Sequence, residues 1–187
     1  MVDVALSHVA VLVRSLDHAA GFLKKHGLFL HDKEFMPGEG TAEIYVGEHA
    51  KTARLLIVEA VSPGPYTKAL KQRGPGLHHI GIDAHDLNAY VEGLNGSGWY
   101  LLPQSLRTIH TQRTAWLARP GTPLLIEVHE RRPPDLPAHV AKLALPLNEK
   151  ERRMVAALGV SQLTHSHDQS SYVTVGGATF KLTDLLT

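Results

Sequence analysis

The sequence predicts an α+β protein in which two βαβββ modules pair to form one open, curled mixed sheet. First, a histidine opens an apolar, β-branched run twice, in Ser7-His8-Val9-Ala10-Val11 and in His79-Ile80-Gly81-Ile82. Second, the offset of 71 residues between His8 and His79 holds downstream without a gap, so that Gly27-Leu28 matches Gly98-Trp99. Third, a helical pattern and further strands follow both runs. Matched units at a fixed offset indicate an internal duplication.

The first module, about residues 1–73, begins with a strand at residues 4–13. Ser15 or Asp17 is expected to cap a helix that ends before Gly27, because polar side chains favour helix starts and glycine favours helix ends. Apolar and alternating runs predict strands at 28–34, 41–46 and 53–60, with a turn at 36–40. A short helix at 66–72 follows the break at Ser62-Pro63-Gly64-Pro65.

The second module, about residues 74–130, repeats this order. We expect a strand at 79–83, a helix at 86–94 and strands at 99–102, 113–118 and 124–129, with a hairpin turn over 119–123. Residues 131–187 form a C-terminal α/β-hairpin extension without a counterpart in the repeat. It consists of a stiff proline-rich linker at 131–137, a helix at 148–158 and a Gly176-Gly177 hairpin. Its role is left open.

Composition narrows the function classes. A formal net charge of +1 gives no reason to expect nucleic acid as a partner. The chain has no cysteine, which excludes disulfides and thiol chemistry and suits the cytoplasm. No signal peptide is recognised, and no apolar run reaches the roughly 18 residues that a membrane span needs. We therefore expect a cytoplasmic protein without a nucleic-acid or membrane partner. Independently of the composition, we also expect a small-molecule substrate and a homodimer.

The predicted site consists of His8, His79 and Glu127. The two histidines occupy the same place in the repeat, and Glu127 interrupts the apolar run Leu124-Leu125-Ile126-Glu127-Val128. A buried carboxylate is costly unless it is paired or bound to a metal. Side chains alternate along a strand, so His78 and His79 are expected to point to opposite faces. Two imidazoles and one carboxylate on separate strands predict a site for one divalent metal ion with open positions.

Each ligand also has an ordinary structural interpretation. A lone histidine at a strand start is usually a satisfied structural residue, and a lone glutamate in a strand usually faces solvent. The repeat places Leu56 where a fourth ligand would correspond to Glu127. Leucine cannot bind a metal, so the site is expected to have three protein ligands or to take a fourth from elsewhere.

Glu43 is the candidate general base. It lies in the middle of the strand predicted at 41–46, where every second residue faces the cavity. A carboxylate there can remove a proton from a carbon next to a carbonyl, although a solvated strand residue is an equal alternative. Tyr45 shares its face. Trp116 either lines the pocket or belongs to the core.

Several other side chains are weaker candidates. The loop residues His165-Ser166-His167-Asp168 have a metal-like composition but are expected to be solvated, and no pattern places His85 or His110 at the site. Three arginines are candidates for binding a substrate carboxylate or phosphate: Arg54, Arg73 and Arg113.

Residues 5–130 resemble the vicinal oxygen chelate superfamily, which includes glyoxalase I, methylmalonyl-CoA epimerase, extradiol dioxygenases and bleomycin-resistance proteins. The resemblance rests on Ser7-His8-Val9-Ala10-Val11, on Gly74-Pro75-Gly76-Leu77-His78-His79-Ile80 and on Leu125-Ile126-Glu127, and it is closest to the epimerase branch. It implies that the metal ligands are His8, His79 and Glu127. The segment from Gly38 to Ile44 resembles the family's Gln-Gly-Val segment and places Glu43 on a catalytic glutamate.

The resemblance therefore implies a lyase or isomerase that depends on zinc, nickel, cobalt, manganese or iron and enolises a small carbonyl or thioester substrate. Glu43 and Glu127 are its predicted catalytic carboxylates. Two departures keep alternatives open. Leu55 or Leu56 replaces the further Gln or Glu ligand of the epimerases, and Ala118-Arg119-Pro120 replaces their His-Pro-Lys. The alternatives are an Fe(II) extradiol-type dioxygenase and a non-catalytic binding protein of the bleomycin-resistance type.

Overall fold

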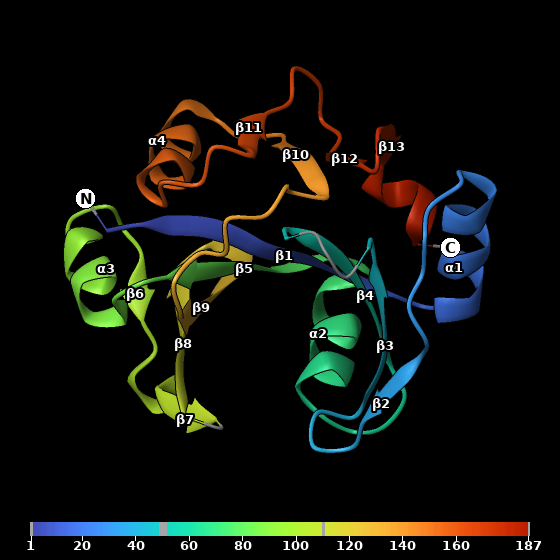
Figure 1. The fold of residues 1–187 in the computed structure, drawn as a ribbon, viewed down its shortest axis with the longest axis horizontal. Helices are drawn as coiled ribbons and strands as arrows, with labels where there is room; N and C mark the ends of the chain where they lie inside the picture. The colour runs from blue at the N-terminus through green and yellow to red at the C-terminus, as the bar shows by residue number, and fades with distance from the viewer. Residues whose placement is uncertain (1, 49–51, 110, 187) are drawn as a thin grey trace.

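A computed structural model describes residues 2–48, 52–109 and 111–186 of the chain (Figure 1). The elements of the first module are β1 (Val4–Val13), α1 (Leu16–Lys25), β2 (Glu34–Met36), β3 (Thr41–Val46), β4 (Arg54–Ala60) and α2 (Pro65–Arg73). Those of the second are β5 (Gly76–Ala84), α3 (Leu87–Gly93), β6 (Tyr100–Leu101), the 3-10 turn η1 (Pro103–Ser105), β7 (Arg107–Ile109), β8 (Gln112–Arg119) and β9 (Thr122–Glu130).

The larger sheet confirms the predicted α+β fold of paired modules. Its strand order is β2-β3-β4-β1-β5-β9-β8-β6, with β7 paired to β8. In each module the first strand lies parallel to the last, β1 to β4 and β5 to β9, and the antiparallel pair β1–β5 joins the modules. The strand predicted at 28–34 is largely absent: the segment contributes the bridge from Leu30 to Val46, and β2 begins only at its last residue, Glu34. Strand β7 has no counterpart in the prediction.

The register of the central strands shows the duplication directly. Across β1 and β5, Ala10 lies opposite His79 and His8 lies opposite Gly81. The repeat offset of 71 residues relates Ala10 to Gly81 and His8 to His79. Superposition of the first module on the second therefore turns each of these two pairs into the other. A local two-fold relation therefore runs through the central strand pair. It brings the two histidines to the middle of the sheet.

The helix starts repeat in the same detail. Ser15 caps α1 by accepting a hydrogen bond from the third residue of the first turn, and Asp86 does the same for α3. The carboxylates of Glu59 and Glu130 accept hydrogen bonds from the first backbone N–H of α1 and α3, at 2.8 and 3.1 Å. A carboxylate there satisfies an unpaired donor and complements the helix dipole.

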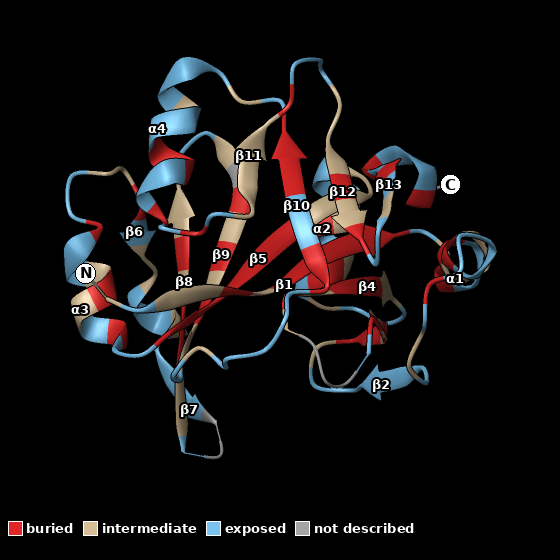
Figure 2. Cartoon of the chain, turned by 45° about the horizontal axis from the view of Figure 1, so that its top comes forward, coloured by how far each residue is buried: buried red, intermediate tan, exposed pale blue. Residues whose placement is uncertain are grey.

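The two faces of the larger sheet are covered differently. One face packs on α1, α3 and the C-terminal extension, and the other curls around α2 (Figures 1 and 2). The core on the first face contains alternate residues of β1, such as Val9, Val11 and Val13. On the curled face, an apolar cluster joins α2 to the strands of the first module: Ala10, Leu12, Leu56, Val58, Tyr66 and Ala69.

The extension forms a second, smaller sheet with the order β11-β10-β12-β13. Its elements are β10 (Val140–Leu145), α4 (Glu149–Ala157), β11 (Leu163–His165), β12 (Tyr172–Val175), β13 (Ala178–Lys181) and the 3-10 turn η2 (Leu182–Leu185). The Trp99 indole donates to the Met154 carbonyl at 3.0 Å, and the Tyr90 hydroxyl donates to the Leu158 carbonyl at 3.0 Å. Both bonds join the extension to the second module.

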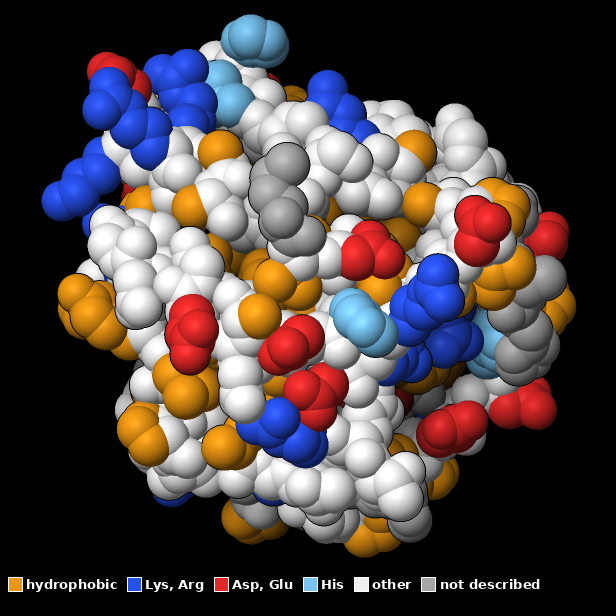
Figure 3. Space-filling view, turned by 60° about the vertical axis from the view of Figure 1, so that its left-hand side comes forward, with side chains coloured by type: hydrophobic (Ala, Val, Ile, Leu, Met, Phe, Trp, Pro, Cys, Tyr) orange, Lys and Arg blue, Asp and Glu red, His pale blue; other side chains and the backbone are white. Residues whose placement is uncertain are grey.

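The surface carries both signs of charge. On the face in Figure 3, neither basic nor acidic side chains form a continuous layer. Among the described residues, no helix has the length and apolar character that crossing a membrane requires.

Candidate metal centre

Three candidate ligands converge on the curled face of the sheet. His8 comes from β1, His79 from β5 and Glu127 from β9. The Nε2 atoms of the two histidines are 2.9 Å apart, and Glu127 Oε2 is 3.7 Å from each of them. The side chains are 6%, 2% and 17% exposed in the same order, so the cluster opens on the side of the carboxylate.

A β-bulge on each central strand brings these histidines together with their neighbours. The register between β1 and β5 shifts around Ser7 and again around His78, so that each is the extra residue of its strand. The two bulges occupy equivalent places in the repeat. The prediction that His78 and His79 point to opposite faces is therefore wrong: their Nδ1 atoms lie 3.0 Å apart. A bulge interrupts the alternation on which that prediction depended.

The bulges supply an outer partner for each histidine ring. Nδ1 of His8 lies 3.3 Å from Ser7 Oγ, and Nδ1 of His79 faces His78. His78 is itself stacked on Tyr66 of α2, with 4.5 Å between ring centroids. A metal-binding histidine usually donates its second ring N–H in this way, which fixes the ring and leaves the other nitrogen free to bind.

A glycine makes room for the His8 ring. A methyl group placed on Gly81 would lie 2.3 Å from the ring atoms Cε1 and Nδ1 of His8. Such a contact is too short for any side chain larger than hydrogen. Gly81 is the residue opposite His8 on β5, so the sequence His78-His79-Ile80-Gly81 carries both a candidate ligand and the space for the other one.

Burial sets the protonation of the cluster. Burial lowers the pKa of His8 to about 4 and holds the pKa of His79 well below its usual value, so both rings are neutral at pH 7. Burial alone would raise the pKa of Glu127. The hydrogen bond from His129 is the largest effect in the opposite direction, and together with Arg107 and the neighbouring imidazoles it lowers the pKa. Two neutral imidazoles and one carboxylate are the protonation states that metal binding requires.

The donor set fits a divalent metal. Bonds of about 2.1 Å to nitrogen or oxygen allow two ligand atoms to be at most about 4.2 Å apart, and all three separations in the cluster are shorter. Two neutral nitrogens that face each other at 2.9 Å can share at most one proton, and a bound cation would satisfy both lone pairs. Within the described chain, this is the group of histidines and carboxylates that could hold a metal.

His129 is a site residue that the sequence analysis missed. It follows Glu127 by two positions on β9, and its Nε2 lies 3.2 Å from Glu127 Oε2. Its Nδ1 lies 3.7 Å from the buried carboxylate of Asp83, which also pairs with Arg131 at 2.7 Å. Arg131 in turn donates to Ser7 Oγ at 3.1 Å. The period of two along β9 is the sequence signal that could have identified His129.

Glu43 and the two aromatic candidates face the curled side. Tyr45 lies edge-on to His8, with 6.4 Å between ring centroids, and Trp116 lies edge-on to His79 at 5.0 Å. Glu43 shares the face of Tyr45 and accepts a hydrogen bond from the Thr41 hydroxyl at 2.7 Å. Burial raises the pKa of Glu43, and the negative charges of Glu39 and Glu127 raise it further.

The remaining residues that the sequence offers as candidates lie in different parts of the structure. Arg113 is paired with Glu130 at 3.1 Å, and Arg73 lines a different cavity from Arg54. His85 is exposed at the end of β5, and His110 lies outside the described residues. Asp168 accepts hydrogen bonds from Tyr172 and from the Ser170 backbone, and the group 165–168 brings no set of three ligands together within the described chain.

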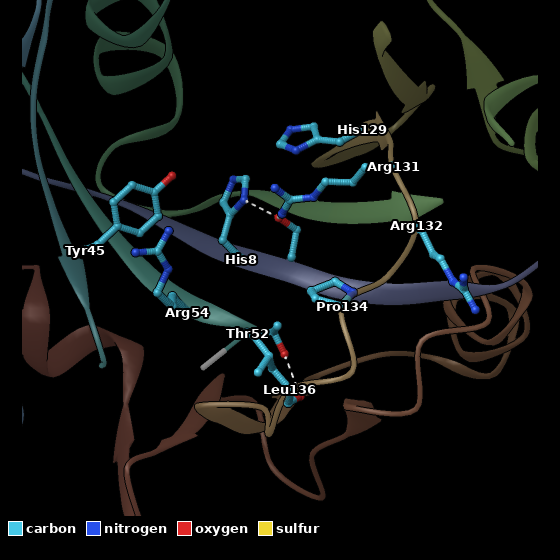
Figure 4. A pocket seen from close by; sticks show the side chains of 10 residues that line it. His8, Tyr45, Thr52, Arg54, His129, Arg131, Arg132, Pro134 and Leu136 are labelled. Atoms are coloured by element: carbon cyan, nitrogen blue, oxygen red, sulfur yellow. Dashed lines mark hydrogen bonds between the residues drawn. The ribbon is translucent and has the colours of Figure 1, made fainter. Parts of the chain in front are cut away.

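Two cavities adjoin the cluster. One of about 390 Å³ is lined by His8 and His129 and lies between the first module and the linker after β9 (Figure 4). The other, of about 650 Å³, lies between α2 and the region of β7 and β8, where His78 and Trp116 form part of its wall. His8 lines the smaller of these two cavities.

Comparison with protein families decides the classification. The family model described as the glyoxalase/bleomycin resistance protein/dioxygenase superfamily matches residues 7–116, more than half of the chain. The chain belongs to this superfamily. The match spans nearly all of the first module and most of the second. No match was found among curated protein sequences.

Solved structures agree with the superfamily assignment. Methylmalonyl-CoA epimerase from Mycobacterium tuberculosis is 26% identical with a TM-score of 0.54, over 68% of this chain and 88% of that one. A hypothetical protein from Bacillus halodurans C-125 is 21% identical with a TM-score of 0.57, over 70% and 96%. An epimerase variant from Streptomyces coelicolor, in complex with 2-nitronate-propionyl-CoA, is 20% identical with a TM-score of 0.53, over 66% and 94%. The last two show the fold alone. Together the superfamily match and the fold support an enzyme of the vicinal oxygen chelate type.

Proposed function

We propose that this protein is a divalent-metal-dependent lyase or isomerase that enolises a small carbonyl or thioester substrate. The observation that carries the proposal is the convergence of His8, His79 and Glu127 within 3.7 Å of one another, beside an accessible cavity. The likeness to methylmalonyl-CoA epimerase from M. tuberculosis supports the same class of reaction.

The three candidate ligands would hold one metal ion. Zinc, nickel, cobalt, manganese and iron all accept imidazole and carboxylate together. A metal held there supplies a Lewis acid that polarises a carbonyl and stabilises the negative charge that develops on its oxygen. The outer partners Ser7 and His78 keep the two rings directed at one point, since each lies next to the ring nitrogen that faces away from it.

Glu43 would remove the proton from carbon. It faces the curled side of the sheet, and its hydrogen bond from Thr41 restrains the carboxylate. A raised pKa brings a carboxylate closer to neutral pH, where a general base works best. His129 would act indirectly, by donating a hydrogen bond to Glu127 and holding its carboxylate in place.

The test has two readouts. Protein purified without chelator is analysed for metal, and its catalysis of deuterium exchange at the carbon next to the carbonyl is followed by NMR with methylmalonyl-CoA as the probe. We expect about one equivalent of zinc, nickel, cobalt or manganese and exchange that a chelator abolishes. His79→Ala should lower metal affinity more than a hundredfold while the circular dichroism spectrum is kept, because backbone pairing with β1 and β9 holds β5 on both sides. A His79→Ala protein with its full metal content would refute the metal site.

A second candidate function is an Fe(II) extradiol-type dioxygenase. The observation in its favour is that Leu56 leaves three candidate ligands, two histidines and one glutamate, which is the facial set that non-haem iron oxygenases use. Oxygen-labile iron in the purified protein, with oxygen uptake on addition of catechol, would favour it over the lyase or isomerase. Protein that binds no metal under any of these conditions would instead favour a non-catalytic binding protein.

A further inference from the structure

We propose that the cavity beside His8 is a subsite for a carboxylate group of the substrate, and that Arg54 is the residue that binds it. This inference rests on the proposed function, because it assigns a substrate class to the same site. The cavity, of about 390 Å³, lies between β4 and the linker that follows β9 (Figure 4).

Arg54 has the position and the free charge for this role. It lies opposite His8 in the parallel pair of β1 and β4. Its guanidinium rests on the Tyr45 ring, with Cζ 4.1 Å from the ring centroid. No carboxylate pairs with it within the described parts of the chain. A guanidinium that is fixed by stacking and has no anionic partner is prepared to bind a carboxylate through two N–H groups.

The other arginines at this cavity are less suited to bind the ligand. Arg131 lies on the opposite side of His8 (Figure 4) and pairs with the buried Asp83 at 2.7 Å, so its charge is already compensated. Arg132 is directed away from His8 in the same view. No acidic residue is found among the described residues that line the cavity. The described lining is therefore cationic, and Arg54 is the arginine in it that lies opposite His8 and is stacked on Tyr45 without a carboxylate partner.

The C-terminal extension builds one wall of the subsite. Pro134 and Leu136 line the cavity, and they lie beyond the region that the family model matches. The Thr52 hydroxyl donates to the Leu136 carbonyl at 3.2 Å, and the Thr52 backbone N–H donates to the Pro137 carbonyl at 3.0 Å. These bonds hold the linker against the first module. The extension thus adds a wall to the pocket on one side of His8.

The geometry favours a carboxylate over a phosphate. Phosphate sites in proteins use several donors, such as a helix N-terminus or a series of backbone N–H groups. The described lining of the cavity combines Tyr45, Pro134 and Leu136 with arginine, histidine and hydroxyl side chains, and none of these residues begins a helix. Arg54 and His8 belong to adjacent strands, about 4.8 Å apart. A substrate that reaches both therefore carries its carboxylate only a few bonds from the carbonyl that is enolised.

The experiment uses malonate as the probe on the full-length protein loaded with cobalt(II). Malonate binding is titrated by calorimetry and by the visible spectrum of cobalt, with malonamide and inorganic phosphate titrated in parallel. We expect Arg54→Gln to weaken malonate binding roughly tenfold to a hundredfold, as the loss of a charged hydrogen bond should. Cobalt content should be unchanged. Arg152→Gln removes the same charge on the exposed face of α4 and should change malonate affinity less than twofold.

The outcomes separate this inference from the proposed function. Normal cobalt binding with equal malonate affinity in the wild type and in Arg54→Gln would overturn the inference and leave the metal site intact. Malonamide that binds as tightly as malonate would also overturn it, and tighter binding of phosphate that depends on Arg54 would replace the carboxylate by a phosphate. If the protein binds no cobalt, the proposed function fails. The calorimetric comparison on metal-free protein then decides the anion subsite by itself.

Discussion

The two modules share a backbone but differ in polarity at equivalent positions. In the second module, Glu127 and His129 face the curled side of the sheet, and Glu127 lies opposite Gly81. In the first module the equivalent residues are Leu56, opposite Ala10, and Val58. Both belong to the apolar cluster that α2 covers. A helix packs on one half of the curled face, whereas the other half keeps its polar side chains beside the cavities.

This difference explains how one fold can carry a one-sided site. Duplication supplies two strands, two bulges and two histidines at equivalent places. Divergence then decides which half holds the carboxylate and which half is filled. A fourth ligand equivalent to Glu127 would have to lie beneath Tyr66 and Ala69 of α2, where an ionised group is costly. The first module instead contributes Glu43 and Arg54, which lie on the same face at the rim of this cluster.

The largest effect is expected for Glu43, the polar contribution of the first module. Glu43→Gln keeps the shape of the side chain and leaves the three candidate ligands untouched. Turnover should fall by roughly a hundredfold to ten-thousandfold with unchanged metal content, the usual value of a positioned base. Thr114→Val, at the equivalent place in the second module, is the matched control, and we expect it to reduce turnover far less. Loss of metal in Glu43→Gln would instead make Glu43 a ligand.

A carboxylate at Leu56 tests whether the modules are interchangeable. Leu56→Glu restores the symmetry with Glu127 but places the charge in an apolar cluster, where the side chain is 4% exposed. We expect it to destabilise the fold by about 3 kcal/mol or more. Leu56→Met keeps the volume and should cost less than about 1.5 kcal/mol. Urea unfolding of metal-free protein measures both, and a stable Leu56→Glu protein with tighter zinc binding would show that α2 does not exclude a fourth ligand.

The bulge residues differ between the modules as well, and the difference can be measured. His78 partners His79 and stacks on Tyr66, whereas Ser7 partners His8 and is held by Arg131. His78→Phe keeps the stacking and removes the hydrogen-bond partner. We expect metal affinity to fall roughly tenfold to a hundredfold, the usual effect of losing an outer partner. Ser7→Ala should act in the same direction, and competition with a chelator compares the two. Unchanged affinity in both variants would show that the bulges shape the sheet without tuning the ligands.

Part of this arrangement could be predicted from the sequence and part could not. The fold and the pairing of His8 with His79 follow from periodicity and from the repeat offset, which depend on regular strands. Glu127 is identified because it interrupts an apolar strand, and the family resemblance supports all three residues. The bulges break that regularity. Strand alternation therefore predicts opposite faces for His78 and His79, whereas the two rings are in contact. The network through His129 and Asp83 depends on register between β5 and β9, which no local pattern encodes. The linker reaches His8 only because long-range hydrogen bonds tie it to Thr52.

The smallest effect concerns the stability of the first module as a function of pH. Burial raises the pKa of Glu43 above its unfolded value, so the folded protein prefers the protonated carboxyl. Below the unfolded pKa the carboxyl is protonated in both the folded and the unfolded protein, so it does not affect stability. Above the raised pKa of the folded protein, ionisation of Glu43 destabilises the fold by its full amount.

Glu43→Gln keeps the hydrogen bond from Thr41 and removes this destabilisation. It should therefore stabilise metal-free protein at pH 7.5 by less than about 1 kcal/mol, because the group is partly exposed, and leave it unchanged at pH 3.5 if it still folds there. Urea unfolding at both pH values measures the difference. A Glu43→Gln protein that is less stable than the wild type at pH 7.5 would contradict this account, because it would mean that a favourable interaction holds the Glu43 carboxylate.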